Sequence, residues 1–150
     1  MTDDHVKINF RLERDSDDYP PQDVESMWAV PVGNDSYRLD NVPFFVRGVS
    51  SEDIVRAKRE DGVLFFSGLV EAGGHSTVRV LIWNRDEMQV VRDELRAMGC
   101  SSEGTNIPGL VAVDIPPSVR YADVREFLMA GEQNGRWEFE EGCIAQPAEN

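Results

Sequence analysis

The sequence predicts an α+β protein in which a small N-terminal β barrel or curled sheet packs on a C-terminal ferredoxin-like βαββαβ sandwich. Between Thr77 and Ile144 the residues follow the order strand, helix, strand, strand, helix, strand, which is the pattern of that sandwich. Before Thr77, short strands alternate with turns and almost no helical periodicity is present. We therefore expect an all-β subdomain over residues 1–75 and a ferredoxin-like subdomain over residues 76–150, joined in one compact unit.

The strands of the first half are predicted by alternation of apolar and polar residues. They cover residues 6–13, 26–32, 36–42, 53–60 and 63–71. Asp61-Gly62 is a tight hairpin signal between the last two of these stretches. Several short strands separated by turns are typical of a small barrel.

The second half opens with a strand over residues 77–83, followed by a helix. Asn84 and Glu87 have the spacing of a capping box, and Gly99 supplies the left-handed residue that ends a helix. An apolar stripe at spacings of three and four supports this helix: Met88, Val91, Leu95 and Met98.

The remaining elements complete the sandwich. We expect a weak edge strand over residues 100–106, a buried strand over residues 110–116 and a last strand over residues 137–144 that places Trp137 and Phe139 on one side. The second helix lies before the last strand and has these signals: Ser118 as its cap, Val124, Phe127 and Leu128 as its inner face, and Asn134-Gly135 as its end.

The two central strands have two apolar faces, and each face needs cover. One face is expected under the helices: Val78, Val80, Ile82, Val111, Val113 and Ile115. The opposite face is too apolar for water and is expected to pack on residues 1–75: Leu81, Trp83, Leu110 and Ala112. Strand parity also places Arg79 and Asp114 on this second face, where we expect a structural ion pair.

The charge of the chain restricts its partners. The sequence has 15 Lys and Arg against 28 Asp and Glu, a formal charge of -13 that is spread over both halves. Such a surface repels phosphate backbones and anionic lipid, so we expect no nucleic acid and no membrane among the partners unless a local basic patch reverses the field. It attracts basic proteins, although acidity also serves solubility.

We expect a cytosolic protein, because the start MTDDHVKINF has no apolar signal segment and no run approaches the roughly 20 apolar residues of a membrane helix. Cys100 and Cys143 are predicted on opposite edges of the sheet, about 14 Å apart and too distant for a disulfide. We expect no metal and no cofactor. The cysteines and histidines of the chain do not have the spacings of known zinc sites. Residues 13–25 are acidic, but they lack the glycine and the terminal glutamate of a calcium-binding loop.

Candidate chemistry is concentrated after Gly74. His75, Ser76 and Arg79 follow a glycine pair, so a bend of the backbone can present an imidazole, a hydroxyl and a guanidinium to an anionic group. The glycines precede a strand, however, whereas phosphate-binding loops precede a helix. A group of aromatic residues is either a ligand pocket or core: Trp28, Phe44, Phe45, Phe65 and Phe66.

The run from residue 25 to residue 80 resembles the bacterial domain of unknown function 4265 family. The similar segments are Trp-Ala, Asn-x-Pro-Phe-Phe, Gly-Val-Ser-x-x-Asp and Gly-His-Ser-Thr, and the likeness extends over roughly residues 6–145. The resemblance implies one bacterial unit and adds neither a catalytic residue nor a role. The residues that match these segments are candidates for a site: Asn41, Pro43, Phe44, Asp53, Gly74, His75, Ser76 and Arg79. Among them Asn41, Phe44, Asp53 and Gly74 are ligand-binding candidates.

Three classes of function follow. The charge and the lack of a catalytic set favour a non-enzymatic protein that binds a basic partner, as acidic immunity proteins or inhibitors do. One alternative is a small-ligand sensor of the ferredoxin-like fold, although the turn at residues 84–86 lacks the glycine that such sensors carry. The other alternative is a small enzyme that uses His75 and Arg79. The oligomeric state is open.

Overall fold

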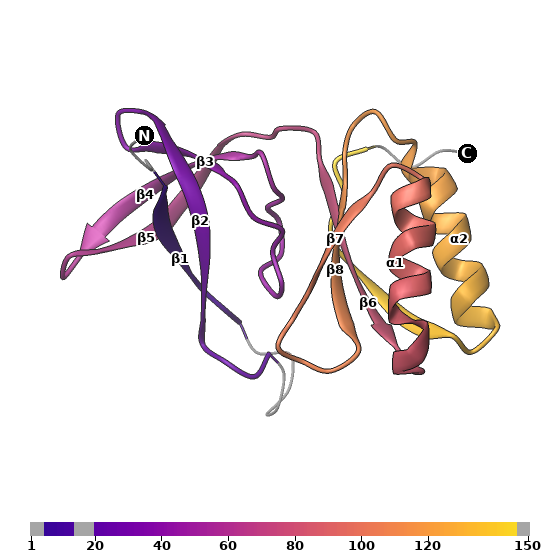
Figure 1. Ribbon diagram of the computed structural model, residues 1–150. Helices are drawn as coiled ribbons and strands as arrows, with labels where there is room; N and C mark the ends of the chain where they lie inside the picture. The colour runs from indigo at the N-terminus through magenta and orange to yellow at the C-terminus, as the bar shows by residue number, and fades with distance from the viewer. Residues whose placement is uncertain (1–4, 14–19, 147–150) are drawn as a thin grey trace.

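The computed structural model describes residues 5–13 and 20–146 of the chain, and it contains two sheets that lie side by side (Figure 1). The strands of the first sheet are β1 (Val6–Arg11), β2 (Val24–Gly33), β3 (Ser36–Leu39), β4 (Ile54–Glu60) and β5 (Val63–Glu71). Those of the second are β6 (Ser76–Ile82), β7 (Ser101–Gly104), β8 (Leu110–Ile115) and β9 (Trp137–Cys143). The helices are η1 (Arg85–Glu87), α1 (Met88–Ala97) and α2 (Tyr121–Gln133).

The first sheet is a closed barrel in the order β1-β2-β3-β4-β5. Its sequential neighbours are antiparallel, and the parallel pairing of Asn9 with Phe65 closes the ring between β1 and β5. Alternate residues of the strands fill the interior, as the sequence pattern predicts. The buried core of the barrel consists of Ile8, Phe10, Met27, Ala29, Leu39, Val49, Val55, Ala57 and Leu64. Residues 14–19, which carry much of the acidic stretch considered for calcium, are outside the described residues.

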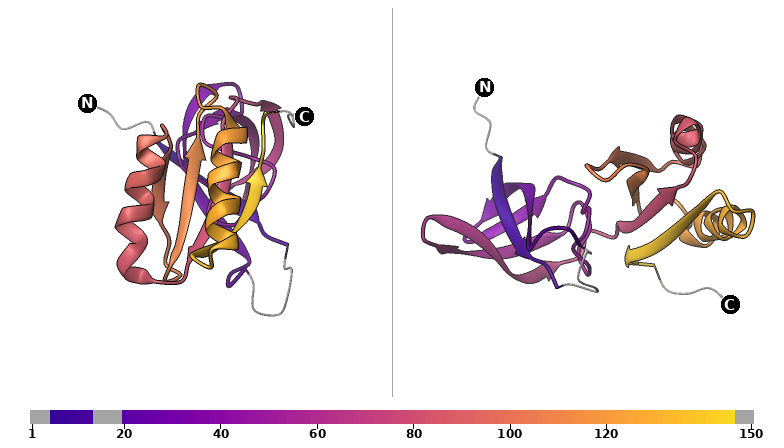
Figure 2. Two further views of the ribbon diagram at one scale, coloured as in Figure 1. Left: turned by 90° about the vertical axis from the view of Figure 1, so that its right-hand side faces the viewer. Right: turned by 90° about the horizontal axis from the view of Figure 1, so that it is seen from below.

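The second sheet is antiparallel throughout, in the order β7-β8-β6-β9. Thus β6 and β8 are the central neighbours that the sequence predicts. Both helices cover the same face of this sheet (Figure 2). All six residues predicted for that face are buried in one core with Val91, Leu95, Val124, Leu128 and Trp137.

The first helical segment differs from its prediction at the start. A 3-10 turn, η1, precedes α1, and the Asn84 side chain accepts a hydrogen bond from the Asp86 N–H at 3.0 Å. Glu87 does not reach back to complete a capping box; its carboxylate pairs with the Arg136 guanidinium at 3.6 Å. Asn84 therefore caps the segment alone.

The prediction that Ser118 caps the second helix is wrong. Helix α2 begins at Tyr121, and the Tyr121 N–H donates to the side-chain oxygen of Gln146 at 2.8 Å. The Gln146 amide also donates to the Val119 carbonyl at 2.6 Å. A residue that follows β9 therefore satisfies the helix start, which local sequence signals cannot reveal.

The predicted ion pair between Arg79 and Asp114 is also wrong. The register places Arg79 opposite Ala112, and Asp114 lies opposite Thr77. Parity assigned both side chains to the correct face, but it does not fix which residues are neighbours. Arg79 pairs with Glu140 instead, and Asp114 pairs with His75.

The barrel and its loop leave one end of the second sheet's outer face uncovered. The loop at residues 40–53, between β3 and β4, lies between the two sheets (Figure 1) and contacts the outer face around Thr77 and Arg79. At the far end of β6, Leu81 is half-buried, and Trp83, which directly follows the strand, is 54% exposed. The expectation that residues 1–75 cover Trp83 is therefore wrong. We call Leu81, Trp83, Leu110 and Glu138 the open half of the sheet.

Both cysteines are free thiols. Cys100 precedes the edge strand β7 and belongs to the core under the helices, whereas Cys143 ends the opposite edge strand β9 and is half-buried. Within residues 5–13 and 20–146, no helix combines the length and the apolar character needed to span a bilayer.

Candidate functional site

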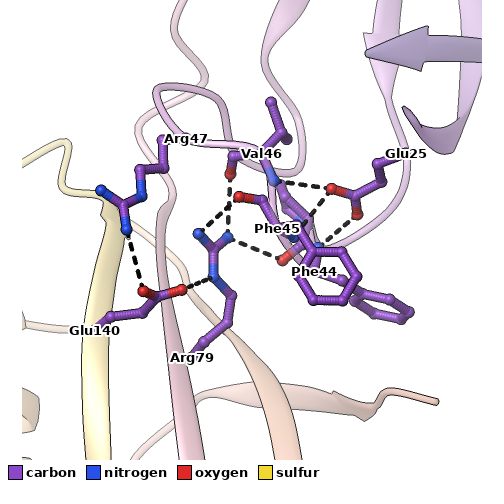
Figure 3. A network of polar contacts seen from close by, with 8 residues as sticks. Glu25, Phe44, Phe45, Val46, Arg47, Arg79 and Glu140 are labelled. Atoms are coloured by element: carbon purple, nitrogen blue, oxygen red, sulfur yellow. Dashed lines mark hydrogen bonds and ion pairs between the residues drawn. The ribbon is translucent and has the colours of Figure 1, made fainter. Parts of the chain in front are cut away.

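Arg79 lies at the centre of a network that joins the two sheets (Figure 3). Its side chain projects from β6 and is fully buried. The guanidinium donates to the carbonyls of Pro43, Phe45 and Val46 at 3.4, 3.2 and 3.1 Å. Its Nε donates to the Glu140 carboxylate on β9 at 3.0 Å. Four contacts therefore hold one side chain, and three of them go to the loop between β3 and β4.

The same loop is held from its other side by Glu25. This residue projects inward from β2, and its carboxylate accepts hydrogen bonds from three consecutive N–H groups, those of Phe44, Phe45 and Val46, at 2.6, 3.0 and 2.9 Å. Consecutive amides directed at one carboxylate form a concave anion site. Here the protein's own glutamate occupies that site.

These contacts give the loop a charged residue on each side. The peptide groups at residues 43–46 direct N–H groups toward Glu25 and carbonyls toward Arg79, so both ends of the peptide dipoles face an opposite charge. Gly142 on β9 leaves room for the guanidinium, because a Cβ there would lie 2.7 Å from Nη1 of Arg79. We call Glu25, Pro43–Val46, Arg79 and Glu140 the Arg79 network.

Asp53 connects the end of the same loop to the segment that links the two halves. Its carboxylate accepts from the Ser50 N–H at 2.9 Å and from the Gly73 N–H at 2.8 Å. The Ser50 hydroxyl in turn lies 2.6 Å from the hydroxyl of Thr77 on β6. All three side chains are buried, so Asp53 fixes the link to the loop and does not face a ligand.

The other candidates from the sequence are held in the same way. Asn41 accepts from the Trp28 N–H at 3.0 Å, and the buried Ser76 hydroxyl accepts from the Ala145 N–H at 2.9 Å. Gly74 has a φ of +89°, and an added Cβ would lie 3.3 Å from Pro117. A left-handed residue packed this closely explains a glycine there.

His75 and Asp114 form a second polar cluster. Nδ1 of His75 lies 2.9 and 3.0 Å from the two carboxylate oxygens of Asp114. Burial raises the pKa of Asp114 above its usual value, and the hydrogen bond from His75 opposes that rise. The imidazole is 19% exposed. Among the described residues Nε2 has no partner, so this nitrogen is free to exchange a proton with a bound molecule.

The open half of the sheet adjoins a cleft of about 300 Å³. Glu138, Leu81 and Leu110 are neighbours in one row across β9, β6 and β8. The cleft is lined by Arg79, Leu81, Leu110, Glu132, Glu138, Phe139 and Glu140. It therefore combines an apolar floor with three carboxylates, while the guanidinium of Arg79 is already bonded within the Arg79 network.

The described residues contain no group of three or more side chains arranged to hold a metal ion. Cys100 has no activated thiol, because burial and the nearby Asp114 raise its pKa to about 11. Cys100 therefore does not complete His75 and Asp114 as a nucleophilic triad.

The structure brings the family-like segments together around one loop, but it also adds residues that the sequence did not indicate. Glu25 could have been found, because strand alternation with Met27 and Ala29 places an acid inside the barrel. Glu138 and Glu140 could not have been found from the sequence, because their positions depend on the register of β9 with β6.

Comparisons with known proteins support this organisation. The family model described as "Domain of unknown function (DUF4265)" matches residues 25–139. A solved structure described as a hypothetical protein from Neisseria gonorrhoeae is similar at 17% sequence identity with a TM-score of 0.80, covering 98% of this chain and 100% of that chain. At this identity the likeness concerns the fold alone. No curated protein matches the chain.

Proposed function

The chain belongs to the DUF4265 family, and we propose that it is a non-enzymatic binding protein that holds a basic protein partner on the open half of its second sheet. The observation that carries the proposal is the row of Glu138, Leu81 and Leu110 beside the acidic cleft. An arginine or lysine side chain has an aliphatic stem and a cationic end. Leu110 is only 7% exposed, so the half-buried Leu81 would contact the stem and the exposed Glu138 would pair with the cation.

Two further features of this surface support a protein partner. Trp83 directly follows the end of β6, two residues after Leu81, and is 54% exposed. Exposed tryptophans are frequent energetic centres of protein interfaces. Glu138 is exposed and has no hydrogen bond or ion pair among the described residues, so its carboxylate can pair with an incoming cation without losing an internal partner.

The overall charge supports the same assignment. With 28 acids against 15 bases, the chain attracts cationic proteins over distances of about a Debye length, roughly 8 to 10 Å at moderate salt. Association should be fast at low salt and slower at physiological salt, while dissociation changes less.

The contacts of the candidate catalytic residues favour binding over catalysis. Ser76 and Arg79 are buried and fully engaged in contacts within the protein. Among the described residues every buried side-chain nitrogen and oxygen has a hydrogen-bond partner. Buried polar groups that are all satisfied internally are typical of structural networks.

One observation favours the enzyme alternative. The free Nε2 of His75, with Nδ1 held by Asp114, is the arrangement of a general base. In this alternative His75 acts without Arg79, whose guanidinium is bonded to the loop. If the purified protein converts a substrate and His75→Ala abolishes the conversion at an unchanged melting temperature, this alternative replaces the binding proposal.

We further assign the second subdomain to the ferredoxin-like class, because the element order β6-α1-β7-β8-α2-β9 is combined with the sheet order β7-β8-β6-β9. Sensors of this class bind small ligands, so the ligand-sensor alternative rests on the fold alone.

The binding proposal is tested by affinity capture with the full chain and two charge-reversed variants. Glu138→Lys alters the open half, and Glu126→Lys makes the same charge change at an exposed position of α2, on the other face of the sheet. We expect the native protein and the Glu126→Lys variant to retain the same basic protein from a bacterial lysate, and the Glu138→Lys variant to lose it.

The association rate of the captured partner should then fall as salt rises, and addition of the partner should change the fluorescence of Trp83. Equal retention by both variants contradicts the assignment of the open half. Retention of no basic protein by the native chain contradicts the function itself.

A further inference from the structure

We infer that the outer wall of the barrel carries a second binding surface, for single-stranded nucleic acid. This surface, the basic strip, consists of Lys7, Arg11, Trp28, Lys58 and Phe65. It lies on β1, β2, β4 and β5, on the barrel at the left of Figure 1, and it is independent of the open half of the second sheet.

The register makes the strip continuous. Lys7 on β1 lies opposite Trp28 on β2, and Lys58 on β4 lies opposite Phe65 on β5. Asn9, two residues after Lys7, pairs with Phe65 and joins the two parts where the barrel closes. Cationic and aromatic residues thus alternate across four neighbouring strands.

The cations lie against the aromatic rings. Nζ of Lys7 is 4.9 Å from the centre of the Trp28 ring system, and Cζ of Arg11 is 3.9 Å from the centre of the Phe65 ring. Cation–π contacts of this kind hold long side chains over the rings and keep their charge exposed. Trp28 itself is 46% exposed, so part of its ring remains open to a partner.

The acidic residues near the strip lie at its margins. Glu60, at the end of β4, contacts Arg11 at 3.2 Å, and Asp40, after β3, contacts His5 at 2.6 Å. Arg11 is therefore paired with a carboxylate, whereas Lys7 and Lys58 have no ion pair among the described residues. With Arg11 the two lysines form a local basic patch, the condition under which the expectation drawn from net charge alone does not hold.

The combination of residues favours single-stranded nucleic acid over an acidic protein. Cations contact phosphates, and bases stack on aromatic side chains and on guanidinium planes. The carboxylates of an acidic peptide would pair with the cations, but aspartate and glutamate side chains have no aromatic ring to stack on Trp28 and Phe65. A single-stranded segment uses both kinds of side chain at once.

The inference is tested by fluorescence anisotropy with the full chain and a dye-labelled oligothymidylate of about 15 nucleotides, a length near the upper end of the site sizes of known single-strand-binding domains. We expect binding at low salt, and a plot of log K against log salt with a slope of about -1.4, because phosphates neutralised by the two unpaired lysines contribute about -0.7 each. Trp28→Ala should weaken binding roughly tenfold or more.

The charge contribution is separated by a matched pair of variants. Lys58→Glu should weaken binding and make the salt slope less steep. Arg96→Glu makes the same charge change at an exposed position on α1 and should alter the affinity and the slope only through the net charge of the chain. Circular dichroism melting confirms that each variant is folded.

Absence of binding at low salt, or equal losses in the two charge variants, overturns the inference. So does competition by a poly-glutamate peptide as effective as competition by the oligonucleotide, which would assign the strip to an acidic protein. None of these results bears on Glu138, so failure of the strip and failure of the proposed function are distinguishable.

Discussion

Replacing Arg79 by alanine should destabilise the whole chain, because its guanidinium holds the loop between β3 and β4 against the second sheet. The substitution removes the bond to Glu140 and the three bonds to loop carbonyls. It also leaves Glu25 bonded to one side of the loop while the carbonyl side loses its partner. The buried side chain cannot be replaced by water without opening the contact between the sheets.

The expected change in the free energy of unfolding follows from the interactions that Arg79 makes. Removing one partner of a buried ion pair typically costs about 3–5 kcal/mol, and each orphaned buried carbonyl costs about 1–3 kcal/mol. These contributions overlap, since they come from one guanidinium, so we expect a loss of about 4 kcal/mol. Arg79→Lys retains the charge but not the planar fork of donors, so it should recover only part of the lost stability.

Urea unfolding, followed by circular dichroism, measures this loss. Arg47→Ala is the matched control, because Arg47 contacts the same Glu140 carboxylate at 3.3 Å from an exposed position and should cost less than about 1 kcal/mol. A cost below about 1 kcal/mol for Arg79→Ala as well would refute the structural role of Arg79. It would also make this residue a catalytic candidate again.

Other substitutions and reagents test particular parts of the fold. Gly131→Ala would place a Cβ 1.9 Å from the indole of Trp137, so the chain should unfold at much lower urea than the native protein; equal midpoints would disprove this packing. Trp83→Ala should change the free energy of unfolding by less than about 1 kcal/mol, and a loss near 3 would mean that the indole is covered. At pH 8 Cys143 should react with a thiol reagent before unfolding, whereas Cys100, with a pKa of about 11, should react only after unfolding; its reactivity in the folded state should rise only as pH approaches that value. A single reactive thiol after denaturation would contradict the assignment of both cysteines as free.

The sequence predicts the elements of the fold well, because each is encoded locally. The period-two alternation of residues 6–13 and 63–71 is sufficient to place two strands of the barrel. The stripe from Met88 to Met98 places α1 and its inner face. Hydrophobic patterning also orders the central strands, since only buried strands carry apolar residues on both faces.

Contacts between segments that are distant in the sequence are harder to predict. The pairing of Arg79 depends on the register of β6 with β9 and on a loop more than 30 residues earlier, and neither has a local signal. The same holds for Gln146 at the start of α2. In each case a side chain that looked chemically available to ligands satisfies a backbone group elsewhere in the chain.

This explains why the candidates from the sequence include structural residues. Glycine, serine, aspartate and arginine in short segments are the residues that bind ligands, and they are equally the residues that satisfy a buried irregular loop. Asp53 and Ser76 have the second role here, because each accepts a backbone N–H from another segment. Trp28, from the Trp-Ala segment, is different: its side chain is exposed and is held by a cation instead of the core. Function in this fold is therefore better sought where large side chains remain exposed, on the barrel wall and on the open half of the second sheet, than where the polar segments satisfy one another.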